Sequence, residues 1–255
     1  MIFYFSATGN SRYVADRVAA VTGEPRRSIA ACRRAQDLSF TPAEDEAVGI
    51  LSPVYFWGLP TTVDEFLDQL RLGARPAYLW FAATYGTTTG QAGRFVAEHL
   101  KKKGLTLDAR FSVKMPDTWT PMFDLSDAAK VRRIERAAEP QIDALIRRVQ
   151  RRDRGDFMRD KVPLCAVRLY YPHYEQMRRT AHLTVTDACV GCGLCAKGCP
   201  ISAIELRDGA PVWIAERCVM CLACLHHCPK SAIQYGRRTA GHGQYVHPLY
   251  QGKMP

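Results

Sequence analysis

The sequence predicts two unequal domains: a larger α/β domain built on a doubly wound, five-stranded parallel sheet, and a smaller α+β domain that follows it. Residues 1–150 alternate short β-rich runs with helical patterns, which is typical of a parallel sheet covered on both faces. Most of the ten cysteines are crowded into a short repeated stretch near the carboxyl end. A chain of 255 residues, 47% of them hydrophobic, can bury one sizeable core and one small satellite core.

The strands and helices expected in the larger domain follow one another regularly. Five segments have the composition of strands: Met1–Phe5, Glu24–Ala30, Ala47–Ser52, Ala77–Thr84 and Leu105–Met115. Apolar residues at helical spacing lie between them: Val14, Val18 and Val21, then Phe66, Leu67 and Leu70, then Phe95, Val96 and Leu100. A last helix is expected over Leu125–Val149, where Pro140 should kink or break it.

Changes in composition suggest where the domains begin and end. We expect the α/β domain over residues 1–152 and a basic, aromatic connecting segment over residues 153–182. The small domain should occupy residues 183–236. The remainder, residues 237–255, is rich in Gly, His, Tyr and Pro, so we expect a tail without regular structure.

The small domain contains an internal repeat, because the pattern from Cys189 to Pro200 recurs from Cys218 to Pro229. Each copy reads C-x-x-C-x-x-C-x-x-x-C-P, the run by which bacterial-type ferredoxins bind [4Fe–4S] clusters. A tight loop supplies three thiolates to one cubane, and the fourth comes from the other copy. Two clusters are therefore predicted. Cluster one would be bound by Cys189, Cys192, Cys195 and Cys228, and cluster two by Cys218, Cys221, Cys224 and Cys199.

Other interpretations of the cysteines fit less well. A structural zinc site needs four ligands, which two C-x-x-C pairs can supply. It requires neither the third closely spaced cysteine nor the Cys-Pro that each copy of this motif contains. Metal ligation explains the close spacing better than disulfides do, and the first residues lack a secretory pattern, so a reducing, cytoplasmic compartment is expected. Cys32 and Cys165 lie outside the repeat and should be small buried hydrophobes. His226 and His227 should be exposed rather than ligating.

A second candidate site follows the first expected strand, where Ser6-Ala7-Thr8-Gly9-Asn10-Ser11 leads into a helix. Hydroxyls and free amides at a helix N-terminus stabilise a phosphate, although a lone turn of this kind is more often a simple helix cap. Aromatic residues gather where two further strands end, in the segments 52–60 and 84–86. Ligands of open α/β sheets bind at this edge, but the same aromatics could also belong to the core.

These segments resemble the phosphate loop and the two flavin-flanking loops of flavodoxins. The resemblance implies FMN. It assigns the phosphate to Ser6, Thr8, Gly9, Asn10 and Ser11, and the isoalloxazine to Pro53, Tyr55, Trp57, Gly58, Tyr85 and Gly86. Trp119, after the last strand, is a weaker candidate. Over nearly its full length the chain resembles ferredoxins with an N-terminal flavodoxin-like domain.

The resemblance implies an electron-transfer flavoprotein that passes low-potential electrons between two [4Fe–4S] clusters, FMN and a redox partner protein. The alternative is an FMN-dependent reductase of a small molecule, such as a quinone, fed by its own clusters. A nicotinamide site is not indicated, because Gly86, Gly90 and Gly93 miss the G-x-G-x-x-G spacing. A nucleic-acid-binding zinc protein would leave the phosphate loop unexplained.

The charge of the chain bears on its partners. Lys and Arg outnumber Asp and Glu by 35 to 25, and basic runs occur at Lys101–Lys103 and Arg147–Arg154. We expect these runs to face an acidic docking surface on the redox partner. The longest apolar stretches are too short to span a bilayer, so no transmembrane helix is expected.

Overall fold

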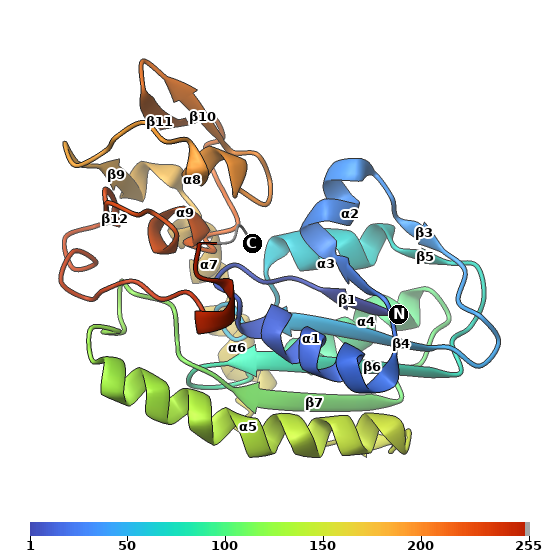
Figure 1. Cartoon of the computed structure of the whole chain (residues 1–255). Coiled ribbons are helices and arrows are strands. Elements are labelled where there is room, and N and C mark those ends of the chain that lie inside the picture. The colour runs from blue at the N-terminus through green and yellow to red at the C-terminus, as the bar shows by residue number, and fades with distance from the viewer. Residues whose placement is uncertain (253–255) are drawn as a thin grey trace.

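A computed structural model describes residues 1–252. The larger domain is built on a six-stranded parallel sheet, ordered β2-β1-β4-β6-β7-β8, and the smaller domain lies against one end of it (Figure 1). The strands of this sheet are β1 (Ile2–Tyr4), β2 (Arg26–Ser28), β4 (Ala47–Pro53), β6 (Tyr78–Tyr85), β7 (Ala109–Lys114) and β8 (Gly155–Asp156). The first five correspond to the five predicted strands, and their order reverses beside β1, as in doubly wound sheets.

Helices cover both faces of the sheet because alternate strand residues point to opposite sides. Phe3 and Ile50 belong to the core beneath α3 (Thr61–Gln69) and α4 (Ala92–Lys102). Their neighbours Ile2 and Leu51 belong to the core beneath α1 (Asn10–Thr22) and α5 (Ala128–Gln150). Every residue of the central strand β6 is buried, as expected for a parallel strand covered on both faces.

Several details differ from the sequence-based expectations. Val21 does not continue the buried stripe of α1, because its side chain is 49% exposed near the end of that helix. The long helix α5 begins at Ala128, after an N-cap at Asp127, and continues through Pro140 without a break. Residues 29–35 form a short helix, α2 (Ile29–Ala35), where the second strand was expected to end. Strand β8 and a two-stranded parallel pair, β3 (Ser39–Phe40) with β5 (Arg71–Leu72), were not anticipated.

The connecting segment carries two short helices, α6 (Leu164–Tyr170) and α7 (Pro172–Met177), and a 3-10 turn, η1 (Thr180–His182). The small domain has two antiparallel pairs, β9 (Leu183–Val185) with β12 (Ile233–Tyr235) and β10 (Ile204–Arg207) with β11 (Ala210–Trp213). Two short helices accompany them, α8 (Leu194–Lys197) and α9 (Ala223–His226). Over residues 237–252 the tail is irregular apart from η2 (Pro248–Tyr250), but it returns to the larger domain, where η2 lies beside α1 (Figure 1).

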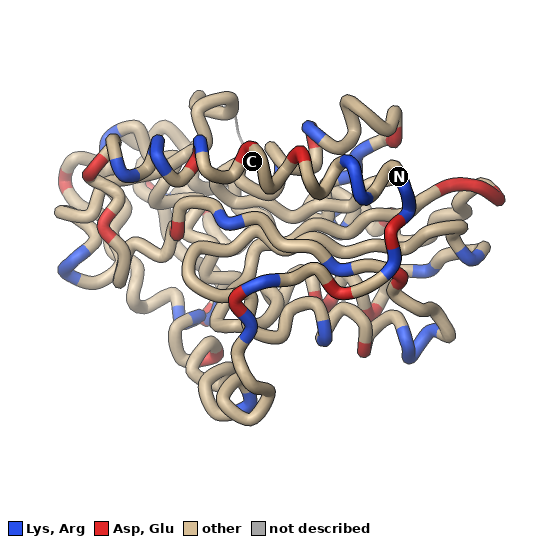
Figure 2. The backbone as a smooth tube through the Cα atoms, turned by 90° about the horizontal axis from the view of Figure 1, so that it is seen from below, with Lys and Arg blue, Asp and Glu red and all other residues tan. Residues whose placement is uncertain are grey.

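The basic runs do not lie near the carboxyl edge of the sheet. Tyr78, at the amino end of β6, donates a hydrogen bond to the carbonyl of Asp153 at 2.6 Å. Tyr85, at the other end of the same strand, is about 23 Å away at the usual rise per residue. Arg151 and Arg154 are also paired with acids, at 3.0 Å to Asp153 and 3.3 Å to Asp108. Figure 2 shows Lys and Arg interspersed with Asp and Glu rather than gathered into one stripe. Among residues 1–252, no helix has the length and apolar character needed to cross a membrane.

Candidate functional site

A cavity of about 430 Å³ opens at the carboxyl edge of the sheet. Its size is within the usual range for cofactor sites. Nine of the eleven predicted flavin-site residues line it: Ser6, Thr8, Asn10, Ser11, Pro53, Tyr55, Trp57, Tyr85 and Gly86. The weaker candidate Trp119 lines it too. The structure therefore brings together three segments that are far apart in the sequence.

The phosphate loop, Ser6–Ser11, ends where α1 begins at Asn10. Gly9 caps this helix with φ of 100°, a conformation that residues with a side chain rarely adopt. The first amides of α1 have no partner within the helix and can bind an anion. The Ser6 hydroxyl already lies inside the loop, 3.1 Å from the amide of Gly9. Among residues 1–252 no Lys or Arg lines the cavity, so neutral donors of this part of the chain would hold a phosphate here.

Two of the predicted phosphate ligands have other partners in the structure. The Ser11 hydroxyl is 2.7 Å from that of Thr84, which joins the helix to β6. The Asn10 amide nitrogen donates to the carbonyl of Pro116 at 3.2 Å, and its oxygen accepts from the Tyr245 hydroxyl at 2.8 Å. Asn10 is therefore a buried junction between loops. Thr8 is the more direct candidate for a phosphate contact, because it is buried, lines the cavity and has no side-chain hydrogen bond to residues 1–252.

The flavin-flanking turn Tyr55–Gly58 has an uncommon backbone. Tyr55 and Gly58 pair across it at 2.8 and 3.0 Å, and both central residues have positive φ, 47° at Phe56 and 67° at Trp57. This conformation favours Asn or Gly, so two aromatics held in it indicate functional strain. The Trp57 carbonyl accepts from the amide of Gln91 at 2.8 Å. Gly58 has a packing role, since a β-carbon there would approach the Tyr171 ring to 2.4 Å.

Other aromatic residues around the cavity have different surroundings. The Trp57 ring packs on Tyr170, with 4.2 Å between ring centres, and Tyr170 also lines the cavity. Tyr170 was assigned only to the connecting segment from the sequence, and its place in an aromatic run was the one available signal. Tyr55 lies edge-on between Phe5 and Tyr174 and thus contributes to the core as well.

Two further residues at the second flanking loop have defined partners. Tyr85 is buried, and its hydroxyl donates to Asp160 at 2.8 Å. Gly86 provides space for Asp117, because a β-carbon at residue 86 would lie 2.2 Å from the Asp117 side chain. Asp117 was not predicted as a site residue, although within the described residues it is the only charged side chain that lines the cavity. Burial raises the pKa of its carboxyl to about 6.

The cysteines of the repeat gather into two groups of four. One small cavity is lined by Cys189, Cys192, Cys195 and Cys228, and another by Cys199, Cys218, Cys221 and Cys224. Each group combines three cysteines of one copy with the last cysteine of the other copy. Burial raises the pKa of Cys195, Cys218 and Cys221, and neighbouring thiols add to the rise: Cys192 and Cys228 at Cys195, and Cys199 at Cys218 and Cys221. The grouping is the one that crossed ligation requires.

The surroundings of these thiols suit iron–sulfur clusters. Burial raises the pKa of Cys221 and Cys224, so deprotonation here requires compensating positive charge, which cluster irons supply. Backbone amides donate to three sulfurs at 3.2 to 3.3 Å, namely those of Cys199, Cys218 and Cys228. Within residues 1–252, no group of three or more His, Cys, Asp or Glu side chains could hold a single metal ion. The four thiolates around a cubane bind four different irons, so they do not need to converge on one point as the ligands of a single ion do.

The two sites share a wall. Met220, Cys221 and Leu222, from the second cysteine loop, line the large cavity together with the phosphate loop and Trp57. A thiol predicted to bind cluster two therefore borders the space predicted for the flavin. The first group of cysteines is more peripheral: Cys192 is exposed, and Val190 in the same loop is 61% exposed.

The two histidines beside Cys228 connect the domains. The expectation that they are exposed is wrong for His226, which is 3% exposed; its Nε2 donates to the Thr118 carbonyl at 2.9 Å, and its Nδ1 accepts from the amide of Tyr245. The Nε2 of half-buried His227 donates to the carbonyl of Ala7 at 3.0 Å. Burial lowers the pKa of both imidazoles, so both are neutral near pH 7. Of the two remaining cysteines, Cys32 is buried as expected, whereas Cys165 is exposed.

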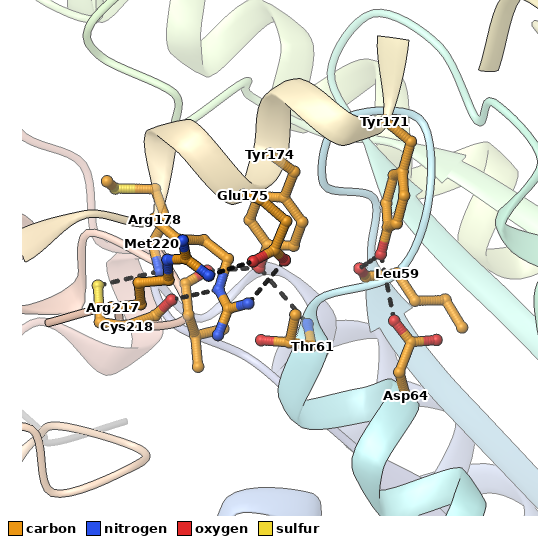
Figure 3. Close-up of polar contacts among 11 residues, drawn as sticks. Leu59, Thr61, Asp64, Tyr171, Tyr174, Glu175, Arg178, Arg217, Cys218 and Met220 are labelled. Carbon is orange, nitrogen blue, oxygen red and sulfur yellow. Dashed lines mark hydrogen bonds and ion pairs between the residues drawn. The ribbon is translucent and has the colours of Figure 1, made fainter. Parts of the chain in front are cut away.

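Helix α7 fixes the relative position of the two domains. Tyr174 is fully buried; its hydroxyl donates to the Val219 carbonyl at 2.6 Å and accepts from the amide of Thr61 at 3.4 Å (Figure 3). Tyr171 donates to the Leu59 carbonyl at 2.8 Å. Arg178 donates to the Cys218 carbonyl at 2.7 Å. The connecting segment thus holds the cluster-two loop against the larger domain.

Comparisons with known proteins identify the same two domains in the same order along the chain. Residues 1–144 match the family model of the flavodoxin domain, and residues 188–233 match that of the 4Fe-4S dicluster domain. No curated protein matches the chain.

Three solved structures are similar in part. Rubredoxin oxygen:oxidoreductase from the anaerobe Desulfovibrio gigas is 20% identical, with TM-score 0.36, over 56% of this chain and 35% of the other. The chain thus spans about a third of that protein's length. A flavodoxin from the domain Archaea is 17% identical, with TM-score 0.33, over 56% of this chain and 96% of the flavodoxin. Fusobacterium nucleatum flavodoxin bound to flavin mononucleotide is 11% identical, with TM-score 0.32, over 42% of this chain and 66% of that flavodoxin.

Proposed function

The chain belongs to the flavodoxin domain family and also carries a 4Fe-4S dicluster domain, and from this premise we propose that it is an electron carrier. The protein would pass low-potential electrons between two [4Fe–4S] clusters, FMN and a redox partner protein. The observation that carries this proposal is the position of Cys221, which lines both the second cysteine cavity and the large cavity. Sites that share a wall allow electron exchange within one chain.

For the flavin, we propose that the phosphate loop binds the phosphate through Thr8, Ser6 and the first amides of α1. Trp57 with Tyr170 would form one aromatic wall of the ring site, and the chain would exclude water there with Met115 and Trp119, which also line the cavity. A bound flavin supplies chemistry that joins one-electron to two-electron transfer.

For the clusters, we propose the crossed ligation of the two groups of four cysteines. Cluster two, with Cys199, Cys218, Cys221 and Cys224, would be the one nearer the flavin. Cluster one, with Cys189, Cys192, Cys195 and Cys228, would be the one nearer the surface, because Cys192 is exposed.

We therefore propose that the redox partner approaches near Val190 and Cys192. The prediction of an acidic docking face rested on the basic runs, and these lie at the amino edge of the sheet, opposite the cavity. A partner bound at that edge would be separated from the cofactors by the length of β6. The position of the runs does not favour docking there.

A second function, an FMN-dependent reductase of a small molecule such as a quinone, is favoured by one observation. Asp117 lines the cavity, and its carboxyl, with a pKa of about 6, can exchange a proton near neutral pH. Reduction of a quinone consumes protons as well as electrons, so a proton-exchanging group would serve such a reaction.

One experiment tests both functions. Protein purified without oxygen should contain about eight irons with matching sulfide and one FMN per chain. A reduced low-potential ferredoxin or dithionite should bleach clusters and flavin together, while NADH and NADPH should leave the flavin oxidised. Stoichiometric zinc without sulfide would refute the cluster assignment. Steady turnover of a small quinone without a protein acceptor would favour the reductase over the carrier.

A further inference from the structure

The tail, for which the sequence suggested no role, packs directly on the phosphate loop (Figure 1). We name residues 244–250 the C-terminal strap. Tyr245, His247 and Tyr250 are each 6% exposed, so these three side chains anchor the strap in the fold, whereas Pro248 and Leu249 between them are exposed. Gln244 anchors its beginning to the small domain by donating to the carbonyl of Cys228 at 2.9 Å.

Two successive carbonyls of the phosphate loop accept hydrogen bonds from the C-terminal part of the chain. The amide of His247 donates to the carbonyl of Thr8 at 2.7 Å, and the Nε2 of His227 donates to that of Ala7 at 3.0 Å. In a trans peptide the carbonyl and the following N–H point in opposite directions. These bonds therefore turn the N–H group of Gly9 away from the strap and that of Thr8 away from His227. The contact between Gly9 N–H and the Ser6 hydroxyl, inside the loop, agrees with this direction.

The strap also controls the side chain that opens the first turn of α1. The Tyr245 hydroxyl lies 2.8 Å from the Asn10 amide oxygen and 2.9 Å from the Glu135 carboxylate. Burial and the nearby carboxylate raise the pKa of Tyr245, so the hydroxyl keeps its proton and remains a donor. The single proton of this hydroxyl is shared between the Asn10 oxygen and the Glu135 carboxylate, and this contact, with the bond from the Asn10 amide nitrogen to the Pro116 carbonyl, fixes the amide.

Close packing at Gly9 shows how tightly the strap is seated. A β-carbon there would lie 2.7 Å from the Tyr250 ring and 2.8 Å from the β-carbon of His247. The His247 ring stacks on Tyr13 of α1, with 4.2 Å between ring centres. The Tyr250 hydroxyl donates to Asp16 on the same helix at 2.7 Å. The loop and the beginning of α1 are thus enclosed by the strap on the side away from the cavity.

We propose that the C-terminal strap and His227 are positioning elements of the phosphate site: they set the peptide orientations of the Ser6–Ser11 loop, and the affinity for the phosphate group of FMN depends on them. This inference rests on the proposed flavin function. Successive N–H groups aimed at one point form an anion-binding nest, and holding them in place before binding reduces the ordering cost of binding. The flavin site is therefore completed by residues outside the flavodoxin domain.

The test compares two substitutions at one residue in the full-length, cluster-containing protein after flavin removal. His247→Pro removes the N–H that binds Thr8, and the φ of His247, −51°, is close to the value that proline requires. His247→Ala removes the imidazole but keeps the N–H. Titration with FMN and with riboflavin, which lacks the phosphate, should show that His247→Pro weakens FMN about tenfold more than His247→Ala. The affinities of the two variants for riboflavin should differ far less.

A second pair keeps the test valid if the proline variant does not fold. Tyr245→Phe removes the donor to Asn10 and should weaken FMN severalfold more than riboflavin. Tyr78→Phe is its matched control, because it also deletes one tyrosine hydroxyl, but at the opposite edge of the sheet, and FMN affinity should stay unchanged. Equal losses for FMN and riboflavin, or a Tyr245→Phe variant that behaves like Tyr78→Phe, would overturn the inference. If the unaltered protein binds no FMN, the proposed function itself fails.

Discussion

The hydroxyl of Tyr174 lies 2.6 Å from the carbonyl oxygen of Val219 and donates a hydrogen bond to it, which joins helix α7 to the loop between Cys218 and Cys221. Tyr174→Phe keeps the buried ring but leaves this carbonyl unpaired, at a cost of about 1–2 kcal/mol. We expect a lower free energy of unfolding and faster loss of cluster two to an iron chelator. The decay of visible absorption measures this loss. Tyr171→Phe is the control, because its hydroxyl binds Leu59 and Asp64 in the larger domain. Equal cluster loss in both variants would contradict the special role of Tyr174.

The crossed ligation of the clusters predicts an asymmetric result. Because Cys228 lies with Cys189, Cys192 and Cys195, Cys228→Ala should disrupt cluster one and spare cluster two. Cys199→Ala should do the reverse. Electron paramagnetic resonance of the reduced proteins, with one cluster removed at a time, can identify the signal that remains. Loss of the cluster formed by a variant's own sequence neighbours would contradict the assignment.

The phosphate loop predicts a difference between two ligands. Thr8→Ala should weaken FMN by about five- to tenfold, because a charge-assisted hydrogen bond to phosphate is lost. Riboflavin should be affected much less. Thr22→Ala, at the other end of α1, is a suitable control, since it also removes one threonine hydroxyl. The Thr22 hydroxyl binds the Val18 carbonyl of its own helix and lies outside the cavity lining. Fluorescence titration measures both ligands, and a parallel loss for FMN and riboflavin would argue against Thr8 as a phosphate contact.

Asp117 predicts a pH dependence with a definite sign. Its folded-state pKa, about 6, lies above the ordinary value of 3.8 because burial penalises the charged carboxylate. The penalty is absent below pH 3.8, grows as the pH rises, and is complete above pH 6. Flavin-free Asp117→Asn protein should therefore gain stability relative to the unaltered protein between pH 5 and pH 7. The difference between their melting temperatures is the measurement, because contributions from the clusters cancel. A constant difference over this range would show that Asp117 is not buried as described.

The exposed position of cluster one predicts where charge changes affect electron transfer. Val190→Glu should slow reduction by a ferredoxin several-fold, because Val190 is 61% exposed beside the cluster-one cysteines. Reversal of the charges of Lys101–Lys103 should have little effect, because this run ends α4 at the opposite edge of the sheet. Stopped-flow reduction rates at several salt concentrations provide the comparison. The opposite pattern would return the docking face to the basic runs.

Local patterns determined much of this protein from the sequence alone. The strands β4 and β6 were predictable because parallel strands covered on both faces are continuous apolar runs. The cysteine groups were predictable as well, because cluster binding restricts both the spacing of the thiolates and the following proline. The turn between β1 and α1 carried the phosphate-site signal only together with the aromatics at two further strand ends, since hydroxyls at a helix N-terminus are by themselves more often a simple cap.

Only the tertiary structure decided which distant groups meet. The sequence marked the neighbourhoods of Asp117 and Tyr170 only through Trp119 and an aromatic run, and it gave no signal at His247, because contacts between distant segments depend on how the domains pack and not on local periodicity. The burial of His226 and the position of the basic runs opposite the cavity were unpredictable for the same reason. The strap is the clearest case: a segment without helical or strand periodicity acquired its contacts with Thr8–Asn10 only because Gly9 left room for it against the folded loop.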